Sequence, residues 1–251
     1  MPFDGFPFRT RLLKDSPMRS ATRTTPRSNM LIAALDGKAC QRLQAALEPV
    51  SLVLGEVLYE PGEPIRHVYF PSDGLISLLA VGEGNLVLEV ALVGREGFFG
   101  IPLALGSRVS SVRALVQGEG TAMRMSAARF LRELKGNPAL QRELNRYANT
   151  LMAQIAQNAA CNRFHVVEAR LARWLLMTFD RLQKKEFRMT QKFLASMLGV
   201  RRVGVTAAAG ALRHRQLIEY RRGSITILDR KGLVAAACQC YQANRNREKL
   251  R

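Results

Sequence analysis

The sequence predicts an α+β fold in three parts: an N-terminal β-roll or jelly-roll barrel, one long helix, and a C-terminal winged helix-turn-helix. Three observations support this prediction. Short β-branched or aromatic runs, divided by Gly, Pro, Asp and Asn, fill residues 50–125. Apolar residues then recur every three or four positions over 138–163. Finally, residues 190–228 contain two short helical runs separated by a glycine, followed by an alternating strand pattern.

Residues 29–135 are predicted to form the roll with its flanking helices, and residues 1–28 a separate tail. The tail is rich in Arg, Thr, Ser and Pro without a sustained period, which is typical of disordered basic segments. Leucines at helical spacing predict a helix over 31–47, and a short helix is expected over 126–135. Between them we expect strands at 51–54, 57–59, 66–70, 75–81, 86–93, 111–117 and 120–125.

The long helix, assigned to residues 136–163, carries a candidate dimer seam. Its seam positions step by three or four, as in a coiled coil; they are Leu140, Leu144, Tyr147, Leu151, Ile155 and Asn158. We predict that these residues form a homodimer interface in which Asn158 fixes the register. The same pattern would also suit a helix packed on its own barrel.

Residues 164–242 are predicted to form the winged helix-turn-helix domain, and residues 243–251 a frayed basic tail. The domain opens with a helix over 167–181, where apolar residues again follow helical spacing. Residues 163–166 are the expected hinge between this domain and the long helix.

The helix-turn-helix is the most informative motif in the chain. Thr190 is a good N-cap for its first helix. Gly199 can adopt left-handed backbone at the corner, and a second helix is expected from about Arg201 to His214. Ala195 and Val205 stand where the two helices pack together. A hairpin follows, with its turn at Arg222-Gly223-Ser224, and forms the wing.

Positive charge is concentrated in the C-terminal third. The formal net charge of the chain is +18. Residues 161–251 hold 20 Lys/Arg and 6 Asp/Glu, whereas residues 29–160 hold 12 of each. A neutral middle joined to a basic end is typical of a regulatory domain attached to one that binds a polyanion.

Double-stranded DNA is the predicted partner of the basic domain. Arg201 and Arg202 open the second helix, where recognition helices contact base edges or nearby phosphates. Arg221 and Arg222 on the wing are suited to phosphate contacts. The full predicted set is Thr190, Gln191, Arg201, Arg202, Gly204, Thr206, Arg221 and Arg222. The alternative is a cyclic-nucleotide-responsive protein whose basic domain binds RNA or an acidic protein.

Cysteine and histidine usage predicts neither a metal site nor an enzyme. The cysteines, Cys40, Cys161, Cys238 and Cys240, are too few for a disulfide framework in a chain of this length. Cys238 and Cys240 could bind metal or sense oxidants, but no neighbouring His or Cys pair supports this, so we expect free thiols. A structural hydrogen bond is expected for His165, although this hinge histidine could report pH. No acid–base or nucleophile set appears.

Hydropathy and the N-terminal residues predict a cytoplasmic protein. No stretch has the length and apolarity of a membrane span, so no membrane partner is expected. The N-terminus lacks the apolar core of a secretory signal.

Several motifs in one order resemble the Crp/Fnr family of bacterial transcription regulators. They are HVYFPSDGLISLL at 67–79, REGFFGIPLALGSRVSSVRALV at 95–116, CNRFHVVEARLARWLL at 161–176 and TQKFLASMLGVRRVGVTAAAGAL at 190–212. The resemblance covers about residues 31–241. It implies a homodimer that binds a two-fold operator, an N-terminal domain of the cyclic-nucleotide-binding fold, and RNA polymerase as a candidate further partner.

The family's nucleotide-binding residues do not carry over cleanly. Gly100 matches the glycine of the family's cassette, but Ile101 stands where the resemblance requires the ribose-binding glutamate. Val109 follows Arg108 where a small hydroxyl residue is expected. Because isoleucine cannot accept bonds from ribose hydroxyls, we predict a divergent or lost pocket, with no cofactor and cyclic nucleotide disfavoured. The candidate effector residues are Gly100, Ile101, Arg108, Ser110 and Ser111. The N-terminal cysteine cluster of the family's iron–sulfur oxygen sensors is not present in the sequence.

Overall fold

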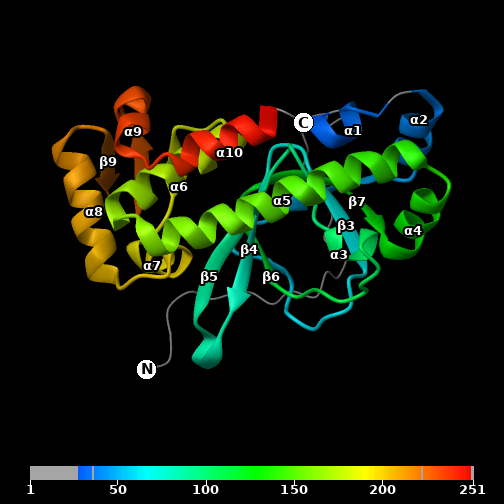
Figure 1. Ribbon diagram of the computed structural model, residues 1–251, viewed down its shortest axis with the longest axis horizontal. Helices are drawn as coiled ribbons and strands as arrows, with labels where there is room; N and C mark the ends of the chain where they lie inside the picture. Colours follow the sequence, from blue (N-terminus) through cyan, green and yellow to red (C-terminus); the bar gives the residue numbers. More distant parts are fainter. Residues whose placement is uncertain (1–27, 36, 222, 250–251) are drawn as a thin grey trace. The chain divides into compact units, whose positions relative to one another are not determined.

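The computed structural model describes residues 28–35, 37–221 and 223–249 (Figure 1). The tail predicted over 1–28 therefore lies outside the described residues, apart from Ser28. Within the described residues the chain forms two compact units. The sensor unit contains residues 28–80 and 92–151, and the C-terminal unit contains residues 81–91 and 152–249.

Seven strands of the N-terminal half form two antiparallel sheets. They are β1 (Glu48–Leu52), β2 (Val57–Tyr59), β3 (His67–Pro71), β4 (Leu75–Val81), β5 (Val87–Val93), β6 (Arg113–Gly118) and β7 (Gly120–Ser126). One sheet has the order β1-β7-β3 and the other β2-β6-β4-β5. All seven predicted strands are confirmed. The first begins earlier than predicted because Glu48 pairs with Arg124 of β7, whose guanidinium contacts its carboxylate at 2.6 Å.

An aromatic cluster holds the sensor unit together. The Phe98 ring packs against Phe70 at 5.2 Å and against Phe130 at 5.6 Å between centroids. Its third neighbour is Tyr147, at 5.8 Å. Strand β3, helix α4 and helix α5 thus meet around one fully buried ring. Burial of such rings is the main stabilising contribution in a core of this kind.

The N-terminal helical segment differs from the prediction. Two short helices, α1 (Met30–Ala33) and α2 (Gly37–Ala45), replace the single helix expected over 31–47. Gly37 has a positive φ of 50°, which is incompatible with a continuous right-handed helix. The buried Asn29 side chain caps α1 and donates to the carbonyl oxygens of Pro71 and Gly97 at 2.9 and 2.8 Å. These long-range bonds fix the start of α1 against the roll.

The remaining helices of the N-terminal half agree closely with the sequence, apart from one unpredicted turn. Helix α3 (Ile101–Ala104) was not predicted. Helix α4 (Ala127–Lys135) begins after Ser126, whose side chain accepts a hydrogen bond from the Arg129 N–H at 3.3 Å. Helix α5 (Pro138–Phe164) is continuous over its whole length (Figure 1).

The C-terminal half contains the predicted helix-turn-helix and wing. Its elements are α6 (Val167–Leu182), β8 (Glu186–Arg188), α7 (Gln191–Leu198), α8 (Arg202–His214), β9 (Ile218–Arg221), β10 (Ser224–Ile227), α9 (Arg230–Ala236) and α10 (Cys240–Lys249). The wing is a three-stranded sheet of order β8-β10-β9. Strand β8 was not predicted, although the buried Phe187 between two exposed neighbours is a weak strand pattern.

The basic end expected to fray is helical as far as Lys249. Tyr241 is 1% exposed and its hydroxyl bonds Asp180 at 2.7 Å, which anchors α10 to α6. Arg230 also bonds both of these side chains, each at 2.8 Å. Tertiary contacts of this kind give a polar helix the stability that its own sequence lacks. Among the described residues, no helix combines the length and hydropathy needed to cross a membrane.

Candidate nucleic-acid interface

Local sequence explains the corner of the helix-turn-helix. The Thr190 hydroxyl accepts a hydrogen bond from the Phe193 N–H at 3.1 Å and caps α7, as predicted. Gly199 ends α7 with φ of 60° and ψ of 41°, in the left-handed region. The Val200 N–H then bonds the Ala195 carbonyl at 2.9 Å. This cap turns the chain sharply into α8.

The two helices pack through small and apolar residues. Ala195 is 7% exposed and Val205 is fully buried, which confirms their predicted packing positions. Helix α6 packs against α7, where the Trp174 ring contacts the Phe193 ring edge-on with 6.5 Å between the ring centroids. The Trp174 indole N–H also donates to Glu89 at 2.9 Å. These contacts hold α7 against α6, and α6 against Glu89 of β5.

Three of the predicted DNA-binding residues meet at the start of α8. The Gln191 side-chain oxygen accepts from Arg202 Nε at 3.3 Å and from the Thr206 hydroxyl at 3.0 Å. All three side chains belong to surface hydrogen bonds, and Arg202 and Thr206 are exposed. The bond to Gln191 uses one of the five N–H donors of the guanidinium. The bond therefore orients the Arg202 side chain, and the other four N–H donors of the guanidinium take no part in it.

The other predicted residues on α8 have different roles. Arg201 is the N-cap residue and is exposed, so its side chain is accessible to a ligand. Gly204 is half-buried, and its N–H donates to the Arg201 carbonyl at 2.9 Å. A Cβ at Gly204 would lie 4.0 Å from Val167. Gly204 thus faces α6 and contributes to helix packing.

Sequence reasoning missed one exposed residue of this surface. Val203 is an apolar residue whose side chain is 72% exposed. It lies three positions before Thr206, so these two side chains share one side of helix α8. An apolar residue at this position can contact a thymine methyl group. The spacing of three positions between Val203 and Thr206 was the sequence signal that could have identified it.

The wing lies beside the first turn of α7. The Met189 N–H donates to the Gly223 carbonyl at 2.7 Å. Gly223 has φ of 78°, and a Cβ there would lie 3.9 Å from the Thr190 methyl group. The Tyr220 hydroxyl donates to the Met189 carbonyl at 3.2 Å, and burial raises the pKa of Tyr220 above its usual value. Tyr220 therefore acts as a neutral hydrogen-bond donor at neutral pH.

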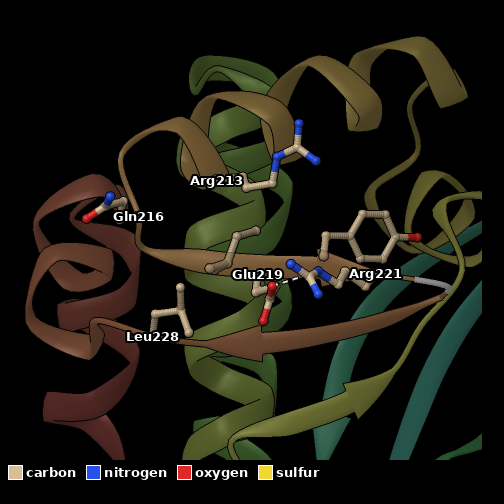
Figure 2. A pocket seen from close by; sticks show the side chains of 7 residues that line it. Arg213, Gln216, Glu219, Arg221 and Leu228 are labelled. Atoms are coloured by element: carbon tan, nitrogen blue, oxygen red, sulfur yellow. Dashed lines mark ion pairs between the residues drawn. The ribbon is translucent and has the colours of Figure 1, made fainter.

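Cationic side chains border a recess next to the wing (Figure 2). The recess has a volume of about 180 Å³ and lies between the end of α8 and strand β9. Arg213 and Arg221 both line it. The Arg221 side chain is 82% exposed, and its Nε contacts Glu219 at 2.8 Å. Arg222, also predicted to bind DNA, lies outside the described residues.

The residues predicted as a dimer seam face inward. Leu140, Leu144, Tyr147 and Leu151 are all at most 7% exposed within the single chain. Tyr147 packs on Phe98, as described above, so this side of α5 covers its own domain and is unavailable to a partner subunit. Asn158 is also buried, and its amide donates to the Val90 carbonyl at 2.8 Å. Only Ile155, at 38% exposed, lies at the surface.

The candidate effector residues differ in burial: some lie in the protein interior and others at the surface. Gly100 has φ of 141°, and a Cβ there would come within 2.5 Å of Val68, so only glycine fits. Ile101 is buried, whereas Arg108 and Ser111 are exposed. Ser110 is 1% exposed and donates its hydroxyl hydrogen to the Val112 carbonyl at 2.7 Å. These residues do not form a set of polar groups directed at one point.

Two family models match the chain. A Crp-like helix-turn-helix domain model matches residues 169–236, and a cyclic nucleotide-binding domain model matches residues 49–137. Together they account for more than half of the sequence, and they do so in the order that the fold displays.

The chain is also similar to a curated protein and to solved structures. It is 24% identical over 182 residues to the Global nitrogen regulator of Nostoc sp., covering 68% of this chain and 81% of that protein. A transcriptional regulator of the CRP/FNR family from Thermus thermophilus is 25% identical, with a TM-score of 0.62 over 76% of this chain and 98% of its own. FixK2 from Bradyrhizobium japonicum shares the fold at 15% identity, with a TM-score of 0.65 over 76% of this chain and 98% of its own.

Proposed function

Because the chain belongs to the Crp/Fnr family of transcription regulators, we propose that it acts as a homodimer that reads a two-fold operator through helix α8. It is a DNA-binding regulator and not an enzyme. The proposal concerns how it binds: which residues contact bases, which surface pairs the two copies, and whether an effector is needed.

The observation that carries the base-reading proposal is the hydrogen-bonded group of Gln191, Arg202 and Thr206. A recognition helix presents its N-terminal residues to the major groove. Gln191 restricts the Arg202 guanidinium before DNA arrives, which lowers the entropy lost on binding. Arg202 then binds a guanine through two donors, and Val203 and Thr206 offer methyl groups to a thymine.

Phosphate contacts come from the wing and from the end of α8. Arg221 is highly exposed, and Arg213 lies across the recess from it (Figure 2). Side chains in these positions fix the register of a protein on the duplex without reading the bases. We assign the same role to Arg201 and Arg222.

We propose that dimerisation uses the outward side of α5. Its exposed residues recur at spacings of four and three, the period of a coiled-coil seam; they are Asn145, Asn149, Met152, Ala156 and Ala159. Met152 is 58% exposed, and Ile155 flanks it. Small alanines on this side allow two helices to approach closely. A two-fold pair of α8 helices would bind half-sites about 34–36 Å apart.

The sensor unit, in this proposal, requires no cyclic nucleotide. Ile101 is buried and apolar, and the Ser110 hydroxyl is committed to a backbone carbonyl. A site built to hold ribose hydroxyls and a cyclic phosphate needs acceptors and cations at these places. We further propose that the protein works in the cytoplasm, where it has access to the chromosome and to RNA polymerase.

The test is binding of the full chain to a promoter fragment identified by genome-wide occupancy, with fluorescence anisotropy as the readout. Arg202→Ala should weaken specific binding roughly 5- to 150-fold, the equivalent of about 1–3 kcal/mol, and relax preference at one base pair in each half-site. Arg129→Ala, on α4, is the matched control and should bind like the parent protein.

Unchanged affinity and unchanged sequence preference for Arg202→Ala would remove Arg202 from the base-reading role. Tighter binding to single-stranded RNA than to duplex DNA would favour the competing function, a basic domain that recognises RNA. Stabilisation by cyclic AMP in a thermal shift assay would contradict the lost pocket.

A further inference from the structure

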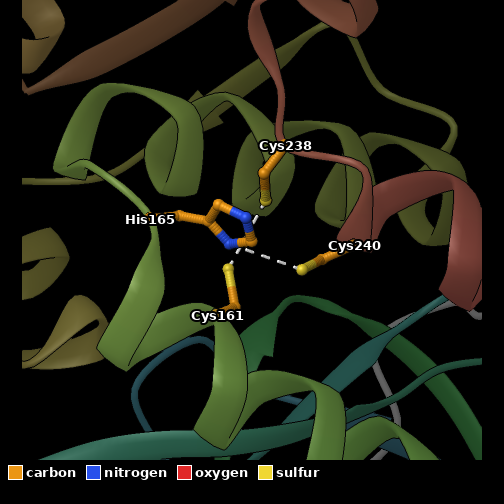
Figure 3. A group of neighbouring side chains, drawn as sticks. All are labelled: Cys161, His165, Cys238 and Cys240. Atoms are coloured by element: carbon orange, nitrogen blue, oxygen red, sulfur yellow. Dashed lines mark hydrogen bonds between the residues drawn. The ribbon is translucent and has the colours of Figure 1, made fainter.

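Three cysteines and one histidine come together in the C-terminal unit (Figure 3). Cys161 lies in the last turn of α5 and His165 follows four residues later. Cys238 and Cys240 lie where the chain passes from α9 into α10. The three sulfur atoms and a ring nitrogen of His165 all lie within 4.8 Å of one another. The sequence alone gave no reason to join these two pairs.

The separations fit a small tetrahedron. Cys161 Sγ lies 3.5 Å from Cys238 Sγ, and Cys240 Sγ lies 3.6 Å from His165 Nδ1. A tetrahedral zinc with Zn–S of about 2.3 Å and Zn–N of about 2.0 Å has ligand edges of about 3.8 Å between sulfurs and about 3.5 Å from sulfur to nitrogen. A disulfide would require about 2.0 Å between sulfurs, and all four cysteines are free.

The sulfur atoms are buried, and one of them accepts a hydrogen bond from a neighbouring amide. Cys161 is fully buried and Cys240 is 3% exposed, so negative charge on either sulfur must be compensated. The Gln157 amide donates to Cys240 Sγ at 3.1 Å. Such partners around the ligands orient them and tune the metal.

We propose that Cys161, His165, Cys238 and Cys240 form a structural zinc site. Three thiolates and one imidazole are a soft, four-ligand set that zinc prefers among the biological divalent metals. Since the protein supplies all four ligands, no position is left for a substrate or an activated water. The site therefore belongs to the structural class of zinc centres and not to the catalytic class.

The metal would cross-link parts of the chain that are remote in sequence. It joins the end of α5 and the hinge residue His165 to the segment that leads into α10. Helix α10 in turn is bonded to α6 through Tyr241 and Asp180. Zinc binding thus fixes the junction between the long helix and the DNA-binding elements. Because the ligands exist as a set only in the folded chain, the metal also stabilises this fold.

The test begins with metal analysis of the untagged full-length chain, purified under thiol reductant. We expect one equivalent of zinc per chain by mass spectrometry. After removal of zinc, titration with Co²⁺ should produce the intense visible bands of a tetrahedral site together with thiolate-to-cobalt charge transfer. These spectra report directly on the ligand set, so they do not depend on any variant folding.

Variants then assign the ligands. Cys238→Ser and His165→Gln should each weaken Co²⁺ binding by at least about tenfold. Charge transfer should fall by about one third in Cys238→Ser, which loses one of three sulfur ligands, and persist in His165→Gln. Cys40→Ser is the matched control: this cysteine is also buried, but it bonds the Ile32 carbonyl in the sensor unit, and its removal should change neither stoichiometry nor spectrum.

Three results would overturn the proposal. One is zinc far below one equivalent in the purified chain, with only weak, six-coordinate cobalt spectra. Another is an unchanged cobalt spectrum in both ligand variants. The third is rapid oxidation to a Cys161–Cys238 disulfide in the presence of excess zinc, which would identify these cysteines as a redox pair.

Discussion

Arg202 begins helix α8 with its guanidinium bonded to a side chain from the preceding helix. The acceptor, Gln191, is eleven positions earlier and also binds Thr206. In the proposed base-reading role, substitution of Gln191 should therefore affect DNA recognition through the freedom of its neighbours as well as through its own contacts. At the scale of single residues, the proposed recognition surface is a small hydrogen-bonded network and not a row of independent side chains.

Gly199 offers a test of the turn at the same scale. Its φ of 60° lies where a side chain costs about 1–2 kcal/mol, and a Cβ there would also come within 2.7 Å of the Leu88 side chain. Gly199→Ala should therefore lower the free energy of unfolding by at least about 1–2 kcal/mol. Gly210→Ala is the matched control, because Gly210 lies within α8 with nothing within 4 Å of its Cβ position. There alanine should stabilise by about 0.5–1 kcal/mol.

Denaturant unfolding monitored by tryptophan fluorescence measures both changes. Trp174 is the single tryptophan and lies in α6, so the signal reports on the C-terminal unit. If the two substitutions changed the free energy of unfolding equally, the left-handed backbone would not be the reason why glycine stands at position 199.

At the scale of elements, helix α5 has two faces with different tasks. Its inner face, which includes Leu144 and Tyr147, is buried in the sensor unit. Its outer face exposes Met152 and two alanines, Ala156 and Ala159. A leucine-rich stripe is the stronger signal in the sequence, but it is the stripe that a domain core requires. The weaker stripe is the one that we propose for the partner subunit.

Met152→Glu tests this assignment. Two carboxylates would face each other across the proposed two-fold axis, and their repulsion and desolvation should convert the dimer to monomer. Sedimentation of the full chain at micromolar concentration measures the change, and operator affinity should fall in parallel. Arg129→Glu, on α4, should remain dimeric. A parent protein that sediments as a monomer, or a Met152→Glu protein that stays dimeric, would show that this face does not pair the subunits.

At the scale of the whole molecule, charge is divided between a neutral sensor region and a basic C-terminal region. Of the 38 basic residues in the chain, 20 lie in residues 161–251. The electrostatic field of such a basic region accelerates association with DNA and contributes affinity that does not depend on the DNA sequence. The same distribution makes binding sensitive to salt.

Salt dependence separates the phosphate contacts from base reading. The logarithm of operator affinity should fall linearly with the logarithm of salt concentration, and each phosphate contact contributes about 0.9 to the slope. Arg221→Ala should therefore reduce the slope by about 2 for a dimer, while leaving the preferred sequence unchanged. A slope equal to that of the parent protein would place Arg221 away from the phosphates.

Sequence alone determined most of the elements, because these follow from local patterns. The seven strands of the roll, the ends of α5, the Thr190 cap and the Gly199 corner were all predicted, since each depends on residues a few positions apart. Charge likewise identified the nucleic-acid-binding half. Helices α9 and α10 escaped prediction because their own sequences are weak and long-range anchors such as Tyr241 stabilise them.

Tertiary structure decided which faces and which distant residues meet. Periodicity shows that α5 has an apolar stripe, but it cannot say whether that stripe covers its own domain or a second copy, because both burials satisfy the same hydrophobic pattern. Nor could spacing join Cys161 to Cys238, since 77 positions separate them. Their proximity depends on how α5, α6 and α10 pack, and that packing is a property of the whole C-terminal unit.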